Sequence, residues 1–166
     1  FDRVVGKLVR PKRIYILGVR SSSFLAGYLN FYFHLIFENV TLVQSAAGEI
    51  FDQMLRIGPG DVLLAIGFPR YSKLTMSAVH FARDRGAEVI AITDSKMSPL
   101  YTLSVASLLV HCEMISFVDS MAAPVSLLNA LIVAVGKQKS AETAETFAEM
   151  ERVWSRYEIF GYEDDE

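Results

Sequence analysis

Short apolar runs alternate along the chain with longer segments in which apolar residues recur every three to four positions. The runs at residues 13–17 and 61–66 show no alternation of polar and apolar residues, which indicates strands that are buried on both faces. Other apolar runs have the length and composition of strands as well. The five expected strands cover residues 13–17, 40–43, 61–66, 87–93 and 107–111.

Helical spacing fills most of the chain between and after these runs. The expected helices cover residues 21–38, 46–57, 72–85, 120–137 and 141–157. A short helix opens at Ser98 and Pro99, and an amphipathic lead-in over residues 1–10 ends at Pro11. The segment 21–38 is apolar nearly all round, so we expect more than one layer to cover it, at a dimer interface.

This alternation of strands and helices determines the predicted fold class. It is typical of a parallel sheet with helices on both faces, and right-handed crossovers favour a flavodoxin-like, doubly wound strand order. We therefore predict an α/β protein, a three-layer α/β/α sandwich with a five-stranded parallel sheet. Residues 1–11 are expected to form a lead-in or linker, 12–160 the domain, and 161–166 an acidic tail.

Composition and charge narrow the class of protein. A chain of 166 residues, 52% hydrophobic and 21% charged, is long enough for one globular domain with a substantial core. The formal net charge of −3 gives no reason to expect nucleic-acid binding by this chain itself. The single cysteine, Cys112, excludes an internal disulfide and fits a cytoplasmic location. The uncharged stretches 21–37 and 120–136 contain polar residues and favour buried or subunit-interface helices over membrane spans.

Two loops that follow expected strands carry candidate binding residues. Ser21, Ser22 and Ser23 follow the first strand, and Arg70 and Ser72 follow the third. In a parallel α/β sheet both loops lie at the carboxyl edge, so we expect them to form a single anion-binding hollow. The serines also fit helix N-caps, and the arginine also fits a surface ion pair. Neither loop is a dinucleotide fingerprint or a P-loop.

A third loop, after the fourth strand, offers Thr93 and Asp94. Their side chains suit hydrogen bonds to sugar hydroxyls, and they equally suit turn formation. The histidines are scattered without the spacing of metal ligands, so no metal and no cofactor is predicted.

The order and spacing of these loops resemble the sugar isomerase (SIS) domain, a sugar-phosphate-binding module. Its first motif, G-x-G-x-S, is matched at Gly18 and Ser22, with Arg20 in place of the second glycine. In its second motif, S-x-S-G-x-T, Gly67, Pro69 and Arg70 stand in place of the two serines and the glycine, and Ser72 stands in place of the threonine. Segments 68–72, 91–95 and 98–100 are similar to the SIS half of RpiR-type transcription regulators. The resemblance implies a five-stranded parallel sheet and a homodimer or higher homo-oligomer.

The resemblance also implies a function. RpiR-type regulators carry a helix-turn-helix domain before the SIS domain, and here such a domain would lie upstream of Phe1. We expect the chain to sense a phosphorylated sugar or a sugar acid and to contact DNA only through that upstream domain, with no membrane partner. The alternatives are a sugar-phosphate isomerase, in which Glu49 would be the catalytic base, and a purely structural dimerisation module.

Overall fold

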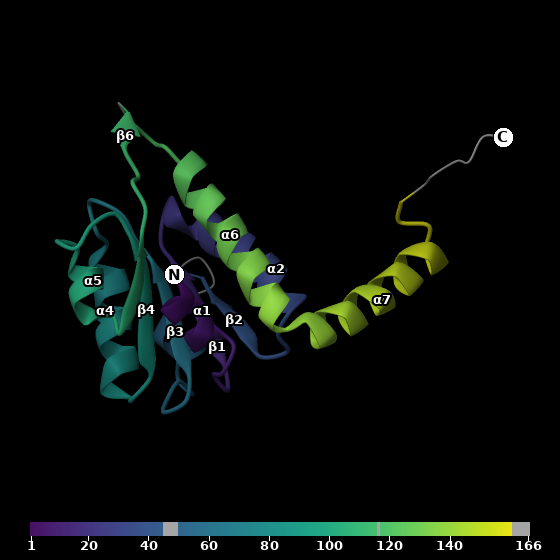
Figure 1. Cartoon of the computed structure of the whole chain (residues 1–166). Helices are drawn as coiled ribbons and strands as arrows, with labels where there is room; N and C mark the ends of the chain where they lie inside the picture. Colours follow the sequence, from purple (N-terminus) through teal and green to yellow (C-terminus); the bar gives the residue numbers. More distant parts are fainter. Residues whose placement is uncertain (45–49, 116, 161–166) are drawn as a thin grey trace.

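A five-stranded parallel sheet forms the centre of the molecule (Figure 1). The computed structural model describes residues 1–44, 50–115 and 117–160. The strands of the sheet are β1 (Ile14–Gly18), β2 (Val40–Val43), β3 (Val62–Ile66), β4 (Glu88–Thr93) and β5 (Ala106–Leu109). Their order is β2-β1-β3-β4-β5, and every neighbouring pair is parallel. This is the flavodoxin-like order, and the predicted fold class is confirmed.

Helices cover both faces of the sheet (Figure 1). One face carries α1 (Asp2–Leu8), α2 (Ser22–His34) and α6 (Ala122–Gln138), and the other carries α3 (Ile50–Gln53), α4 (Lys73–Asp84) and α5 (Pro99–Leu103). Because side chains alternate along a strand, Ile14 and Ile16 pack in the core with the first set of helices, and Tyr15 and Leu17 pack with the second. Both β1 and β3 are buried along their whole length, as their unbroken apolar pattern predicts.

Two helices begin where their capping residues predict. The hydroxyl of Ser72 accepts a hydrogen bond from the amide of Leu74 at the start of α4, at 3.2 Å. The hydroxyl of Ser98 accepts one from the amide of Leu100 at the start of α5, also at 3.2 Å, with Pro99 in the first turn. Each cap turns the chain sharply from the loop that follows a strand into the next helix.

Two helices end earlier than predicted, because a tighter turn follows each of them, with hydrogen bonds from an amide to the carbonyl three residues earlier. Helix α2 ends at His34 rather than at residue 38, and the amide of Leu35 bonds to the carbonyl of Tyr32. Helix α3 ends at Gln53 rather than at residue 57, and the amide of Ile57 bonds to the carbonyl of Met54. Residues 46–49 of that expected helix lie outside the described residues. The other predicted boundaries differ from the observed ones by one or two residues.

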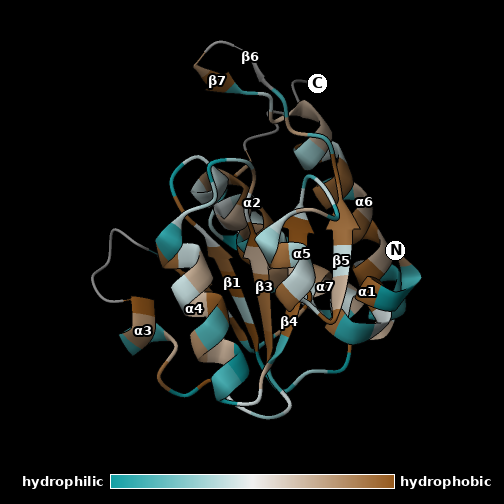
Figure 2. Cartoon of the chain, turned by 90° about the vertical axis from the view of Figure 1, so that its left-hand side faces the viewer, coloured by the Kyte–Doolittle hydropathy of each residue, from teal (hydrophilic) through white to brown (hydrophobic). Residues whose placement is uncertain are grey.

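A short hairpin that the sequence pattern does not predict follows β5. Its strands are β6 (Met114–Ile115) and β7 (Val118–Asp119), which pair in antiparallel fashion. Figure 2 shows the hairpin standing beyond the edge of the sheet at which the labelled strands end. Strands of two residues give no periodic signal, so this element is found only in the structure.

Helix α7 (Ser140–Arg156) extends away from the rest of the molecule (Figure 1). None of its residues is buried, and Phe147 and Val153 on the helix and Tyr157 directly after it expose large apolar side chains. Helix α2 also exposes apolar side chains, with Phe24 at 78% and Phe31 at 61% of their full accessibility. Within the described ranges, no helix has the length and hydropathy that a bilayer span requires.

Candidate ligand-binding site

The two serine-bearing loops meet at a crevice between β1 and β3. The chain leaves β1 toward the face that carries α2 and leaves β3 toward the face that carries α4. Adjacent strands whose connections go to opposite faces leave an open crevice at their carboxyl ends, which is where open α/β sheets bind ligands. A hollow of about 430 Å³ lies at this point. Its polar lining comprises Arg20, Ser21, Ser22, Arg70, Ser72, Thr75 and Asp119.

The first loop brings the start of α2 very close to the end of β1. A Cβ atom added to Gly18 would lie 2.2 Å from the carbonyl oxygen of Ser22, so only glycine fits there. Ser22 is buried in the wall of the hollow, with 6% of its surface exposed. Ser21 is the N-cap residue of α2, but its side chain does not cap the helix. Instead its hydroxyl donates a hydrogen bond to Asp119 Oδ2 at 2.6 Å, and this bond ties α2 to the β6–β7 hairpin.

Ser23 does not line the hollow. Its hydroxyl donates a hydrogen bond to the carbonyl oxygen of Arg20 at 2.6 Å and so stabilises the turn that precedes α2. Of the three serines in the first loop, the structure therefore places Ser21 and Ser22 in the candidate site and Ser23 beside it.

The second loop contributes Arg70 and Ser72 to the same hollow. Ser72 lines the hollow and also serves as the N-cap of α4. Thr75, one turn further into α4, lines the hollow and is 3% exposed. The hollow is thus bounded by the N-termini of two helices that are 13 and 12 residues long.

The third loop lies outside this lining. Thr93 is fully buried, and its hydroxyl donates a hydrogen bond to the hydroxyl of Ser98 at 2.7 Å. Asp94 accepts a hydrogen bond from the hydroxyl of Tyr71. Burial, followed by this bond to a carboxylate, raises the pKa of Tyr71 above its ordinary value. Asp94 therefore joins the loop after β4 to the loop after β3, and Thr93 stabilises the loop after β4 itself.

Sequence reasoning did not select three residues that line the hollow, Arg20, Thr75 and Asp119. A signal existed for Arg20, because it occupies a glycine position of the first motif. No comparable signal existed for Asp119, which reaches Ser21 from 98 residues away along the chain through an unpredicted hairpin. Glu49, the candidate base of the isomerase alternative, lies outside the described residues.

The electrostatics of the hollow favour an anion. Its charged side chains are Arg20, Arg70 and Asp119, a formal sum of +1. The two helix N-termini add about half a positive charge each. Backbone amides at helix N-termini also suit phosphate or carboxylate oxygens. In the described part of the chain, no group of three His, Cys, Asp or Glu residues is arranged to hold a metal ion.

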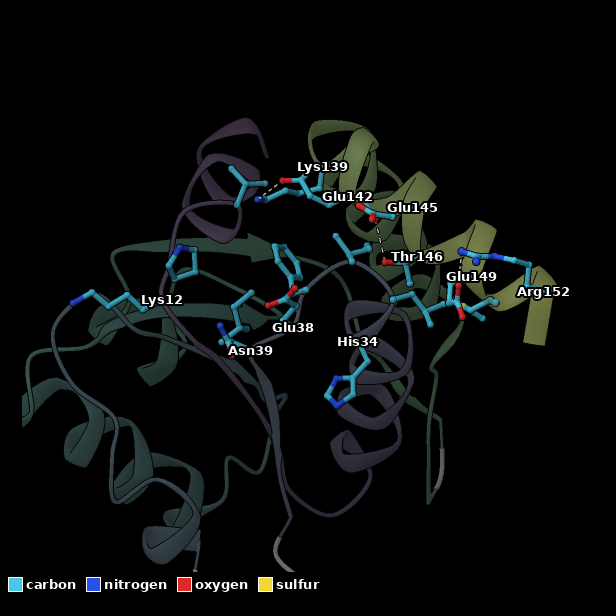
Figure 3. A pocket seen from close by; sticks show the side chains of 17 residues that line it. Lys12, His34, Glu38, Asn39, Lys139, Glu142, Glu145, Thr146, Glu149 and Arg152 are labelled. Carbon is cyan, nitrogen blue, oxygen red and sulfur yellow. Dashed lines mark hydrogen bonds and ion pairs between the residues drawn. The ribbon is translucent and has the colours of Figure 1, made fainter. Parts of the chain in front are cut away.

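A larger cavity of about 760 Å³ lies at the opposite edge of the sheet (Figure 3). It is bounded by the end of α2, the segment that enters β1 and one side of α7, and Lys139 and Glu142 form an ion pair at 2.9 Å on its wall. Because α7 contributes no buried residue, this cavity is the space between a projecting helix and the body of the domain. It also lies at the amino ends of the strands, away from the edge at which such sheets bind ligands. The smaller hollow is therefore the stronger candidate.

Comparison with known proteins identifies the family. The family model of the SIS domain matches residues 7–134. The chain belongs to the SIS domain family. The resemblance inferred from the loop motifs is confirmed. No curated protein sequence matches the chain.

Solved structures of SIS domains share the fold at low sequence identity. The sugar isomerase domain of an RpiR transcription factor from Sphaerobacter thermophilus superposes with a TM-score of 0.85 and 18% identity, covering 91% of this chain and 84% of that one. The Vibrio vulnificus NanR protein complexed with ManNAc-6P gives a TM-score of 0.77 and 19% identity, covering 94% of this chain and 60% of NanR. A Methanococcus jannaschii protein with an inferred function of 3-hexulose-6-phosphate isomerase gives 0.59 and 13%, covering 90% and 77%. Regulators and an isomerase-like protein thus share this SIS fold.

Proposed function

We propose that this chain is the effector-sensing domain of a helix-turn-helix transcription regulator and that its effector is an anionic sugar, first of all a sugar phosphate. The observation that carries the proposal is the convergence of Ser21, Ser22, Arg70 and Ser72 on one hollow between two helix N-termini. The regulators among the structural neighbours support the same role, since NanR was solved with a sugar phosphate. A regulator of this kind acts in the cytoplasm and contacts DNA through a separate domain.

The hollow offers complementary groups to both parts of such an effector. Backbone amides, the hydroxyl of Ser22 and the guanidinium groups suit the phosphate. The carboxylate of Asp119 suits hydroxyl groups of the sugar, because it accepts hydrogen bonds and cannot donate them when ionised.

Ligand binding in this hollow would act on the helices that lead away from it. Helix α2 begins at the first loop, and the bond between Ser21 and Asp119 connects it to the hairpin that leads into α6. Further along, the hydroxyl of Tyr28 on α2 donates a hydrogen bond to Asn129 on α6. We propose that the effector closes the loops and shifts α2 and α6 together, which requires a coupling free energy of about 1–3 kcal/mol.

The partner that would read this shift is a second copy of the chain. Phe24 and Phe31 on α2 and the apolar side of α7 are exposed in a single subunit, and such surfaces are typical of subunit interfaces. Movement of α2 at the interface of a homodimer would change the spacing of the attached DNA-binding domains.

Binding of sugar phosphates tests the proposal directly. We expect one or more of glucose 6-phosphate, fructose 6-phosphate, ribose 5-phosphate and N-acetylmannosamine 6-phosphate to raise the melting temperature, while the unphosphorylated sugars do not. At one hundred times its dissociation constant, such a ligand stabilises by about 2.7 kcal/mol, or about 5–10 °C for a domain of this size. Ser22→Ala should weaken binding, and Arg152→Ala at the larger cavity should leave it unchanged. If no sugar phosphate binds, the sensing function is wrong.

A sugar-phosphate isomerase is the second candidate, because the fold is shared with a protein of inferred 3-hexulose-6-phosphate isomerase function. The two candidates differ in turnover. A sensor binds fructose 6-phosphate or glucose 6-phosphate without exchanging their C1 or C2 protons with solvent, and an isomerase exchanges them. Proton exchange that Glu49→Gln abolishes would establish the enzyme.

A further inference from the structure

Both arginines of the hollow adopt a backbone conformation that favours glycine. The φ angles are +59° at Arg20 and +65° at Arg70, in the left-handed region. Among the described residues, Glu158 is the other non-glycine residue with a positive φ. Left-handed backbone is unfavourable for residues with a Cβ atom, and such conformations tend to be kept where they serve function. Arg20 and Arg70 also occupy two of the three positions at which the matched SIS motifs have glycine, and Gly18 occupies the third.

Two of the three serine hydroxyls in the first loop donate their protons to other groups of the protein. A serine hydroxyl has a single proton to donate. Ser21 donates its proton to Asp119, and Ser23 donates its proton to the carbonyl of Arg20. Pro69 in the second loop has no amide proton. The hydroxyls of Ser22, Ser72 and Thr75 also line the hollow, and the two guanidinium groups add charged donors to them.

The charge of the hollow leads to the same residues. Without the arginines, the carboxylate of Asp119 would cancel the combined charge of about +1 at the two helix N-termini. With both arginines the total becomes about +2, which matches the dianion of a phosphate monoester and exceeds the single charge of a sugar carboxylate. Each guanidinium also presents a planar pair of donors to two phosphate oxygens.

We infer that Arg20 and Arg70 are specificity-determining residues that hold the phosphate dianion between the two loops and select phosphorylated sugars over sugar acids. The inference rests on the proposed function and names the ligand class of the same hollow. Asp119 accepts a hydrogen bond from Ser21, and its carboxylate can accept another from a hydroxyl or amine group of the ligand. A phosphate ester with such a group close to the phosphate would complement both the arginines and Asp119.

Glycine substitutions separate this role from a structural one, because they remove the side chain and relieve the backbone. In calorimetry, we expect Arg20→Gly and Arg70→Gly each to lower the affinity for the most tightly bound sugar phosphate of the panel at least tenfold. The double variant should lower this affinity at least a hundredfold. Glu158→Gly relieves the same backbone conformation away from the hollow and should leave affinity within twofold of the parent. Circular dichroism of each variant confirms that the fold is retained.

Ligand pairs test the selectivity. Glucose 6-phosphate should bind the parent chain at least tenfold more tightly than gluconate, and the double glycine variant should lose most of this preference. If the parent binds a sugar phosphate and the glycine variants bind it within twofold, or if gluconate binds as tightly as glucose 6-phosphate, the inference is wrong while the sensing function stands. If the parent binds no sugar phosphate, both are wrong.

Discussion

Gly18 offers the sharpest test of how the fold builds the hollow. A Cβ atom at this position would lie 2.2 Å from the carbonyl oxygen and 2.7 Å from the carbonyl carbon of Ser22, and 2.9 Å from the Cβ atom of Ala26. Ordinary carbon contacts need about 3.5 Å, so α2 would have to move away from β1 by about 1 Å. The obstacle is backbone, which cannot rotate away as a flexible side chain would.

The expected loss of stability follows from this contact. Extra atoms in a packed core cost about 1–3 kcal/mol, and a clash with backbone belongs at the upper end of that range. For a domain of this size, about 3 kcal/mol lowers the melting temperature by about 6–12 °C. Gly18→Ala should also weaken the binding of any sugar phosphate, because the displaced residue Ser22 lines the hollow.

A glycine in the same helix provides the matched control. A Cβ atom added at Gly27, within α2, would have no heavy atom within 4 Å. Replacing an unobstructed helix glycine by alanine stabilises by about 0.5–1 kcal/mol, so Gly27→Ala should raise the melting temperature by about 1–4 °C. Thermal unfolding followed by circular dichroism measures both variants. Equal melting temperatures for Gly18→Ala and the parent would refute the close approach of α2 to β1.

Three further predictions concern strain, pH and assembly. Arg20→Gly relieves about 1–2 kcal/mol of left-handed backbone strain and loses about 0.5–1 kcal/mol through the flexibility of glycine in the unfolded chain. We therefore expect the free energy of unfolding, measured with denaturant, to rise by about 0.5–1 kcal/mol. A decrease would contradict the strain argument. Burial and a carboxylate raise the pKa of Tyr71 in the folded state, so its contribution to stability is present below about pH 10 and is lost as the pH rises through the folded pKa. Tyr71→Phe should therefore reduce the fall in unfolding free energy between pH 8 and 11. An unchanged fall would count against the buried hydrogen bond. Replacing both Phe24 and Phe31 by serine should convert a dimer into a monomer in light scattering without lowering the melting temperature of the monomer, and an unaltered mass would exclude this face of α2 from the interface.

The middle of the sheet was predictable because β1 and β3 are buried on both faces. Such strands need continuous apolar runs, and β1 and β3 show them plainly. Capping residues set the starts of α4 and α5, because a serine hydroxyl at an N-cap satisfies an otherwise unpaired amide. The strand order then followed from the handedness of the crossovers.

The candidate site was predictable only in part. Parallel topology brings the loops after β1 and β3 together, so Ser21, Ser22, Arg70 and Ser72 were within reach of sequence reasoning. Which serine hydroxyls remain available to the hollow depends on the hydrogen bonds that each makes in the folded loop, and the residue pattern alone does not reveal these bonds. Ser21 bonds to the distant Asp119. Ser23 bonds to its own turn instead of facing the hollow.

Residues that come from distant elements were the hardest to foresee. Asp119 reaches the hollow through a hairpin of two-residue strands, too short to leave a pattern. Thr93 and Asp94 lie at the expected edge of the sheet, but their hydrogen bonds are made to Ser98 and Tyr71. A strand edge predicts proximity to a site, and only the contacts of each side chain decide whether it lines that site.

A crystal structure of the chain with its tightest sugar phosphate tests the central claim most directly. We predict the phosphate between the N-termini of α2 and α4, within hydrogen-bond distance of Ser22 and of the guanidinium groups of Arg20 and Arg70. A phosphate bound in the cavity beside α7 (Figure 3), or anywhere else on the surface, would contradict the account.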